Sequence, residues 1–261
     1  MRIVPILKGF PGVSDRGYLG WSSITWVQSG KVNIVIDTGT YGDYPMLREA
    51  FLRAGIQPEA VDILVLSHFH FDHVINTRLF PNARILLSRT EADYATSGAA
   101  DWAIPEGYFP VVEATRRLEL VNGNEQIAEG VWLMPTPGHT PGHMSVRVQH
   151  DDGRTVVLAA DAVKNLAELL TGEVRMAWDP SVSRRTIEML RQEADVIIPG
   201  HDRVLHLIHG QIHAGETLRI RLTTPTGNQP MDGAQLELVV PGDEAGVRDC
   251  PFCMPDGGSN S

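Results

Sequence analysis

Three histidines and one aspartate lie within six residues, at positions 68–73 of the chain. The segment from Ser67 reads Ser-His-Phe-His-Phe-Asp-His, and it directly follows an apolar run at 61–66. That run is short and rich in branched aliphatic residues, which is typical of a buried strand. The polar segment is therefore expected on the loop at the carboxyl end of a strand, where open α/β sheets place their sites.

The spacing of these side chains favours the binding of metal ions. His68 and His70 would point to the same side of an extended turn, because alternate residues share a face. Asp72 and His73 lie beyond the turn and could face a second position, so one loop could serve two neighbouring cations. Neutral imidazole and carboxylate groups suit Zn²⁺ best, with Fe or Mn as possible occupants. The alternative is a histidine-rich surface loop without a ligand.

Three further motifs follow downstream and carry a family resemblance. Thr-Pro-Gly-His-Thr-Pro-Gly-His occupies 136–143, Ala-Ala-Asp ends at Asp161, and Pro-Gly-His ends at His201. Together with 68–73, and in this order, they resemble the metallo-β-lactamase superfamily of binuclear metallohydrolases. The resemblance runs from about residue 3 to residue 205. It implies an α/β fold, a four-layer αββα sandwich, to which this chain would add a small C-terminal β extension.

The resemblance also implies a set of metal ligands. In that reading, a first metal is held by His68, His70 and His139, a second metal is held by Asp72, His73 and His201, and Asp161 bridges the two. His143 competes with His139 for the ligand role, but the family pattern places the metal on the first histidine of the pair. We therefore expect His143 to support the ligands or to pack beside them.

The family pattern makes a prediction at two further positions, Asp37 and Ile75. Asp37 begins an Asp-Thr-Gly segment at 37–39, which by resemblance holds the metal loop from behind; it could equally cap a strand-to-helix turn. The family commonly has glycine two residues after the last histidine of the first motif. Here that position is Ile75, so the wall of the site should differ while metal binding survives.

Length and composition bound the remaining organisation of the chain. With 261 residues, 28.7 kDa and 43% apolar residues, the chain can bury the core of one large domain. We expect a catalytic domain at 1–205 and a C-terminal extension at 206–249. Period-two alternation at 218–222 and 236–240 predicts a β ribbon in the extension. The residues at 250–261 are expected to form a flexible tail.

Charge and cysteine content exclude some classes of partner. A net charge of −10 opposes binding to nucleic acid, which needs clustered Lys and Arg. No run of about 18 apolar residues is present, so no membrane span is expected. Two cysteines and a poor N-terminal leader indicate a reducing, cytoplasmic location. A small-molecule substrate is favoured, and a homodimer is possible.

Hydrophobic patterns predict the elements that position the motifs. Strands are expected at 24–27 and 32–36 as a hairpin, and at 83–88, 118–121, 130–134, 144–148, 154–160 and 196–198. Helices are expected at 44–54 and 183–193. Lys164, Asn165 and Trp178 follow the strand that ends in Asp161; they could contact substrate, or simply lie at a helix terminus or on the surface.

The segment 97–112 combines glycines and prolines with aromatic residues and has no clear period. Irregular loops of this length tend to be functional, so we expect a lid over the site, with Trp102, Tyr108 and Phe109 facing the substrate. The alternative is an aromatic plug that packs on the edge of the sheet.

A second set of histidines and two thiols lie near the C-terminus. The spacing of His206, His209 and His213 would place them on one helix face, and Cys250 and Cys253 follow. Two thiols with two of these histidines could form a structural zinc site. A lone Cys-x-x-Cys is weak evidence, and an inert or reversibly oxidised pair on the tail is the favoured interpretation.

The function implied by the resemblance is metal-dependent hydrolysis of a small ester, lactone or thioester. A hydroxide bridging two Zn²⁺ ions would attack the carbonyl, with Asp72 as the catalytic group that takes up or returns a proton. The compact chain is most similar to lactonases and glyoxalase II. However, the lactonases usually carry a tyrosine shortly after the bridging aspartate, and none follows Asp161 closely. For a glyoxalase-like substrate, Arg219 and Arg221 are the candidate basic groups.

Two alternatives use the same scaffold. One is an iron-dependent sulfur dioxygenase, in which His68, His139 and Asp161 would hold a single Fe. The other is a compact nuclease, which the net charge disfavours. The number and identity of the bound metal ions would separate the first alternative from hydrolysis.

Overall fold

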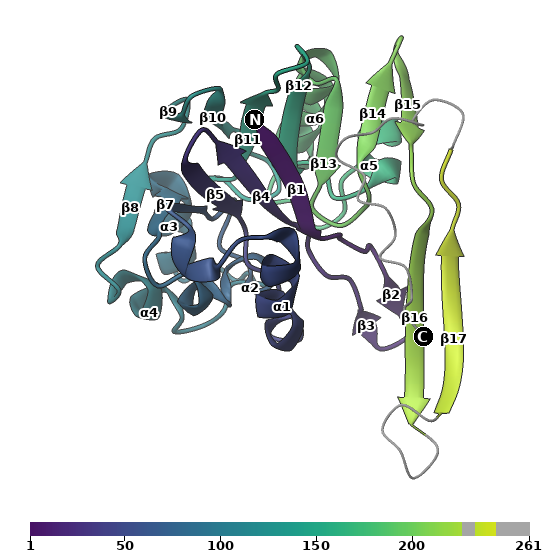
Figure 1. Ribbon diagram of the computed structural model, residues 1–261, viewed down its shortest axis with the longest axis horizontal. Coiled ribbons are helices and arrows are strands. Elements are labelled where there is room, and N and C mark those ends of the chain that lie inside the picture. Colours follow the sequence, from purple (N-terminus) through teal and green to yellow (C-terminus); the bar gives the residue numbers. More distant parts are fainter. Residues whose placement is uncertain (226–232, 244–261) are drawn as a thin grey trace.

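The computed structural model describes residues 1–225 and 233–243, and Figure 1 shows its arrangement. Cys250, Cys253 and the expected tail lie outside the described residues. Two large β-sheets form the centre of the molecule. The strands and helices expected before residue 205 are found, and short strands and helices accompany them.

The first sheet is built from the N-terminal half of the chain. Its strands, in spatial order, are β1 (Arg2–Leu7), β4 (Ile24–Ser29), β5 (Val32–Ile36), β6 (Ile63–Val65), β7 (Arg84–Ser88) and β8 (Leu118–Val121). β5, β6, β7 and β8 pair in parallel, whereas β1, β4 and β5 pair antiparallel. The carboxyl ends of β5 and β6 therefore lie side by side, which brings the segments after them together.

The second sheet is built from the C-terminal half. Its order is β15 (Gln211–Ala214), β14 (Leu205–Ile208), β13 (Val196–Pro199), β12 (Thr155–Ala160), β11 (Met144–Gln149), β10 (Val131–Pro135) and β9 (Gln126–Ala128). Only β12 and β13 pair in parallel. Their carboxyl ends deliver Asp161 and His201 to the same edge of the sheet.

Both faces of each central strand are buried, and this explains the unbroken apolar runs of the sequence. In β6, Ile63 and Val65 join the core between the two sheets, whereas Leu64 faces the other way. In β12, Val156 lies in the core between the two sheets, and Val157 lies in the core on the outer face of the second sheet. The pleat places successive side chains on opposite faces.

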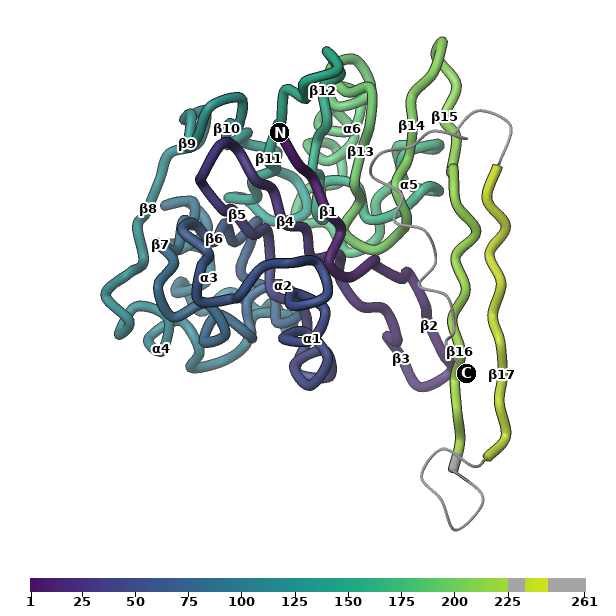
Figure 2. The backbone as a smooth tube through the Cα atoms, viewed as in Figure 1, coloured from purple at the N-terminus to yellow at the C-terminus, as the bar shows by residue number. Residues whose placement is uncertain are grey.

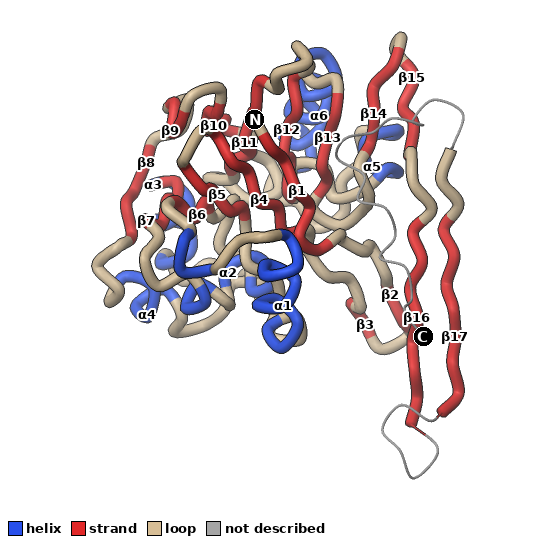
Figure 3. The backbone as a smooth tube through the Cα atoms, viewed as in Figure 1, coloured by secondary structure: helices blue, strands red, loops and turns tan. Residues whose placement is uncertain are grey.

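Helices cover the outer face of each sheet (Figure 3). Beside the first sheet lie α1 (Tyr44–Ala54), α2 (Phe71–Val74), α3 (Arg89–Thr96) and α4 (Phe109–Glu113), with 3₁₀ turns at Pro58–Ala60 and Thr77–Leu79. Beside the second lie α5 (Leu166–Thr171) and α6 (Pro180–Glu193). Phe51 of α1 and Ile187 of α6 are buried in the two outer cores. The layers are helix, sheet, sheet, helix, as the αββα expectation requires.

A ribbon of two long strands follows the second sheet and extends away from it (Figure 2). β16 (Leu218–Pro225) pairs antiparallel with β17 (Gly233–Val240), and Arg221 lies opposite Glu237. Leu218 and Ile220 at its base pack against Phe10. The ribbon thus rests on the N-terminal segment, which also carries the hairpin of β2 (Val13–Ser14) and β3 (Gly17–Tyr18).

The prediction of a helix around His206, His209 and His213 is wrong. His206 lies on β14 and His213 on β15, and the two are directly paired across the hairpin. His209 lies in the turn between them with a positive φ of 51°. The spacing of three and four residues matched a helix, but the chain reverses at Gly210, where φ is 78°. The second sheet consequently continues through this hairpin to Ala214.

Among the described residues, no helix is long and apolar enough to cross a membrane.

Candidate metal centre

Four loops bring the seven predicted ligands into one buried cluster. The loops follow β6, β10, β12 and β13, so each ligand group comes directly after a core strand. The residues are His68, His70, Asp72, His73, His139, Asp161 and His201, and all seven are buried. A rigid strand before each loop fixes where the ligand atoms lie, which is how a site is preorganised.

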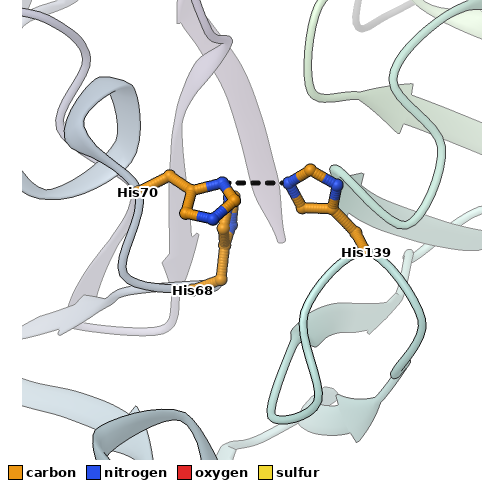
Figure 4. Close-up of side chains that lie close together, drawn as sticks. All are labelled: His68, His70 and His139. Carbon is orange, nitrogen blue, oxygen red and sulfur yellow. Dashed lines mark hydrogen bonds between the residues drawn. The ribbon is translucent and has the colours of Figure 1, made fainter. Parts of the chain in front are cut away.

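The first group is formed by His68, His70 and His139, whose side chains converge from the two halves of the chain (Figure 4). One nitrogen from each lies within 4.8 Å of the other two. Nδ1 of His70 is 3.0 Å from Nε2 of His139. Two imidazole nitrogens at this distance must share a hydrogen or a cation, and Nε2 of His68 is buried without a hydrogen-bond partner among the described residues.

The second group is formed by Asp72, His73 and His201, again within 4.8 Å. Oδ2 of Asp72 lies 3.5 Å from Nε2 of His201 and Oδ1 lies 3.8 Å from Nε2 of His73. The Nε2 atom of His73 is buried and lacks a hydrogen-bond partner in the described part of the chain. The ligand atoms of this group are therefore as close together as those of the first, close enough to hold one cation.

Asp161 lies between the two groups and faces both. Its Oδ2 is 3.2 Å from Nε2 of His139 in the first group. Its Oδ1 is 3.3 Å from Nε2 of His73 and 3.2 Å from Nε2 of His201 in the second. One carboxylate therefore presents a separate oxygen to each group of ligands, which is the arrangement that a bridging ligand needs.

The electrostatics of the cluster favour positive charge at its centre. Burial lowers the pKa of His68 and of His139 well below the usual value, so both imidazoles are neutral and can act as ligands. Burial opposes a charge on His73 as well, but nearby carboxylates outweigh it and raise its pKa well above the usual value. The pKa of Asp161 is held well below its usual range, because neighbouring histidines overcome the effect of burial. A cation would satisfy the same carboxylates.

Asp37 supports the metal loop from behind. Its carboxylate accepts hydrogen bonds from the backbone N–H of Ser67 at 2.8 Å, from the Ser67 hydroxyl at 2.8 Å and from Nδ1 of His73 at 2.7 Å. The last bond leaves Nε2 of His73 as the nitrogen that faces Asp161. Helix α1 begins later, after Asp43, so Asp37 does not cap it.

His143 occupies a different place from His139. Its Nε2 accepts the backbone N–H of Asp161 at 3.1 Å, and its Nδ1 lies 2.9 Å from the hydroxyl of Thr136. Burial lowers the pKa of His143 to about 3, so the ring is neutral and its Nε2 can accept this bond. His143 therefore fixes the backbone at Asp161 and does not join either ligand group.

Two buttressing carboxylates were missed in the sequence. Glu91 is fully buried and accepts hydrogen bonds from the backbone N–H groups of Phe69 and Gly142 and from the hydroxyl of Thr140, at 2.7–3.1 Å. It joins the loop after β6 to the loop after β10, and so holds His70 near His139. It is a single acidic residue in the first turn of α3, and no motif marks it in the sequence.

Asp101 is the second missed carboxylate. Its Oδ2 lies 3.0 Å from Nε2 of His70, and it also accepts a hydrogen bond from the hydroxyl of Tyr94 at 3.0 Å. The bond with His70 lowers the pKa of Asp101 to about 2. Nδ1 of His70 is thereby turned towards His139. A carboxylate behind a ligating histidine fixes both its tautomer and its orientation.

The expected lid segment divides into two parts. Trp102 is 68% exposed and lines the cavity at the ligand cluster. Tyr108 instead bonds to Thr77 and to the carbonyl of Ile75, and Phe109 packs against Phe69 with ring centroids 5.2 Å apart. Tyr108 and Phe109 therefore do not face the cavity, and they correspond to the plug that was the alternative. Ile75 is buried and is not part of the cavity wall.

The remaining wall of the cavity comes from segments far apart in the sequence. Tyr18 of β3, Phe71, Trp102, Lys164 and Met176 surround the ligands. Of the three positions after Asp161 that could contact substrate, only Lys164 lines this cavity. The side-chain oxygen of Asn165 accepts the N–H of Glu168 at the start of α5, and Trp178 is exposed outside the cavity wall.

Comparison with known proteins identifies the family. Residues 18–201 match the model of the metallo-β-lactamase superfamily. The mouse metallo-beta-lactamase domain-containing protein 1 is 28% identical over 216 residues, which cover 81% of this chain and 76% of that protein. An N-acyl homoserine lactonase of Bacillus thuringiensis is 30% identical over 155 residues, 58% of this chain and 59% of the lactonase.

A solved structure shows the same fold. The dizinc quorum-quenching lactonase AidC, in complex with a hexanoyl homoserine product, aligns with a TM-score of 0.58 at 18% identity, over 75% of this chain and 79% of that chain. The chain belongs to the metallo-β-lactamase superfamily. With its buried His/Asp cluster it is a metal-dependent hydrolase of that superfamily.

We expect Gly200→Ala to weaken metal binding. A Cβ atom at residue 200 would lie 2.1 Å from Oδ1 of Asp161 and would displace that oxygen. The affinity for zinc, measured by competition with a chromophoric chelator, should fall on the order of 10- to 100-fold. Gly42→Ala is the control, because its added Cβ would be 3.4 Å from its nearest neighbour. Unchanged zinc affinity in a folded Gly200→Ala protein would contradict this role of residue 200.

Glu91→Ala should lower the free energy of unfolding by about 3 kcal/mol or more, because three buried donors lose their acceptor. Urea unfolding followed by circular dichroism measures the change. Glu49→Ala removes an exposed partner of Arg53 and should stay within about 0.5 kcal/mol of the wild type. Equal effects of the two substitutions would refute the bracing role of Glu91.

Asp101→Ala should reduce the affinity for the first metal about 10- to 100-fold, because His70 loses the group that orients it. Asp101→Asn keeps an oxygen that can accept the bond and should retain most of the affinity. Calorimetric zinc titration of the metal-free proteins separates the two sites. Asp93→Ala, an exposed position on α3, serves as the control. A titration curve of Asp101→Ala that overlays the wild type would exclude this role.

Proposed function

We propose that the chain is a binuclear zinc hydrolase that cleaves a small ester or lactone. The observation that carries the proposal is the position of Asp161, whose two oxygens face two complete groups of ligands. A mononuclear iron site would use His68, His139 and Asp161 and would leave Asp72, His73 and His201 without a purpose. The second group therefore favours a pair of metals over a single one.

The donor set suits zinc. Each group is made of imidazole nitrogens and carboxylate oxygens, and the described residues place no thiolate beside them. When bound, two zinc ions would lower the pKa of a water molecule to about 7 and polarise the substrate carbonyl. AidC is a dizinc lactonase of the same fold, which supports the choice of metal and its number.

The chain's own residues supply position and proton transfer. Asp72 is buried at the cavity wall, where a proton can pass between its carboxylate and the reacting groups. Asp37 and Asp101 hold the rings of His73 and His70 at fixed angles. Trp102 and Phe71 line one side of the cavity with aromatic rings whose centroids are 6.1 Å apart. Fixed polar groups need little reorganisation during the reaction.

Tyr18 offers the hydroxyl that is missing after Asp161. Its oxygen is 2.8 Å from Nδ1 and 3.2 Å from Nε2 of His201, and Nδ1 also lies 3.0 Å from the carbonyl of Trp21. If Nε2 of His201 holds a metal, Nδ1 carries a hydrogen, and the Tyr18 oxygen can only accept from it. The Tyr18 O–H then remains free to donate to a substrate oxygen in the cavity. This position supports ester or lactone cleavage despite the departure from the lactonase pattern.

Other substrate classes receive less support. Arg219 and Arg221 lie on the ribbon and do not line the cavity, so they do not provide a basic site for a glutathione thioester. Lys164 is the cation of the described cavity wall, and its Nζ lies 3.1 Å from Glu168. A nuclease would need more free positive charge for the phosphates.

The test is metal analysis together with a substrate panel. Protein stripped with a chelator should be inactive, and two equivalents of zinc should restore turnover of a lactone or ester above that of a thioester or a β-lactam. His70→Ala and Asp161→Ala should each lower kcat/KM more than about 1000-fold, because metal polarisation contributes several kcal/mol. His213→Ala, whose ring bonds to Asp243 away from the site, is the control. A single iron per chain with oxygen consumption would overturn the proposal.

A further inference from the structure

A groove of about 530 Å³ opens beside the metal cavity. One wall is the N-terminal segment with Pro11 and Val13, and Figure 1 shows the hairpin of β2 and β3 projecting beside β16. The other wall is α5 and the segment after it, with Ala167 and Val174. Ligand sites in proteins commonly have volumes of about 300–1,000 Å³.

The groove and the metal cavity adjoin each other. Tyr18, Lys164 and His201 belong to the walls of both. His201 is one of the proposed ligands of the second metal, so a molecule whose carbonyl lies at the ligand cluster can extend past Tyr18 into the groove. The metal cavity itself is small, about 40 Å³, and has room for a reacting group but not for a whole substrate.

The charges around the groove are balanced. At its inner end Nζ of Lys164 lies 3.1 Å from Glu168 and donates to the carbonyl of Arg175 at 2.8 Å. Glu168 in turn accepts the backbone N–H of Lys164 at 2.9 Å, so both groups are already satisfied. Glu173 and Arg175 also line the groove, are exposed and carry opposite charges. Pro11, Val13, Ala167 and Val174 give the wall its apolar part, and Asn165 and Thr171 add two uncharged polar side chains.

We propose that this groove binds an uncharged aliphatic arm of the substrate while the scissile carbonyl lies at the metal centre. The inference rests on the proposed function and names its substrate class, an ester or lactone with a chain of several carbons. A charged arm would meet no free group of opposite charge at the inner end. Each methylene added to the arm would bury more apolar surface in the groove and so increase the binding free energy, as it does in other apolar pockets.

The test fills the groove from an exposed position. Ala167 is exposed on α5, and Ala167→Trp places an indole in the groove with little effect on the core. Leu170→Trp is the matched control, because Leu170 is exposed on the same helix but does not line the groove. Two series of esters are hydrolysed by the zinc-loaded proteins: p-nitrophenyl esters from acetate to decanoate, and alkyl acetates from ethyl to decyl.

The wild type should prefer longer chains in one of the two series, and that series identifies whether the acyl or the alcohol part occupies the groove. Ala167→Trp should lower kcat/KM for the longest member at least about 10-fold while the shortest member is unchanged. Leu170→Trp should behave as the wild type. Equal effects of Ala167→Trp on short and long members of both series would overturn the inference while leaving the proposed function intact.

Binding provides a readout that is separate from turnover. The dissociation constant of decanol and of decanoic acid is measured by calorimetry with wild type, Ala167→Trp and Leu170→Trp. At least one of the two probes should bind the wild type and lose about 10-fold or more in affinity in Ala167→Trp alone. If the wild type hydrolyses no ester, the proposed function fails, but these affinities still test whether the groove binds an aliphatic chain. Identical dissociation constants in all three proteins would refute binding in the groove.

Discussion

The structure depends on a buried carboxylate that must satisfy two groups of ligands at once. Asp161 lies at the end of β12 with one oxygen towards each group. A buried carboxylate without a positive partner would be costly; the surrounding histidines keep Asp161 ionised, and a bound cation would do the same. The backbone at two neighbouring residues makes room for this carboxylate. Ala160 has a positive φ of 44°, which is unusual for a residue with a side chain, and Gly200 leaves the space that the Asp161 oxygen occupies.

The ligands are held in place by carboxylates that do not themselves join either ligand group. Asp37 bonds to His73, Asp101 bonds to His70, and Glu91 joins the two loops of the first group. Each comes from a different segment of the first half of the chain, whereas Asp161 and His201 come from the second half. The two sheets pack through one shared apolar core, so this packing sets the distance between the two halves of the site. The cluster of candidate ligands is therefore as rigid as the core beneath it.

The convergence of the seven candidate ligands could be predicted from the sequence, because each lies in a short motif directly after an apolar strand. The supporting residues could not, because Glu91, Asp101 and Tyr18 are single polar residues without a motif, and only tertiary packing brings them near their partners. Trp102 illustrates the limit: composition indicated an aromatic segment near the site, but not which ring would face the cavity. The histidines at 206–213 show the opposite error. Their spacing suits a helix, yet the apolar residues alternate between them, and that alternation predicts the two strands that form.

The C-terminal ribbon is connected to the site through the segment that precedes Tyr18. At its base, Glu216 pairs with Lys8, and Arg203 donates to the carbonyl of Pro241 at 3.1 Å. Gly9 lies against the backbone of His201 so closely that a Cβ atom there would be 2.6 Å from the His201 Cα. The extension thus holds the N-terminal segment against the loop of one ligand. Because the same segment continues into the hairpin that carries Tyr18, the ribbon supports one wall of the cavity without entering it.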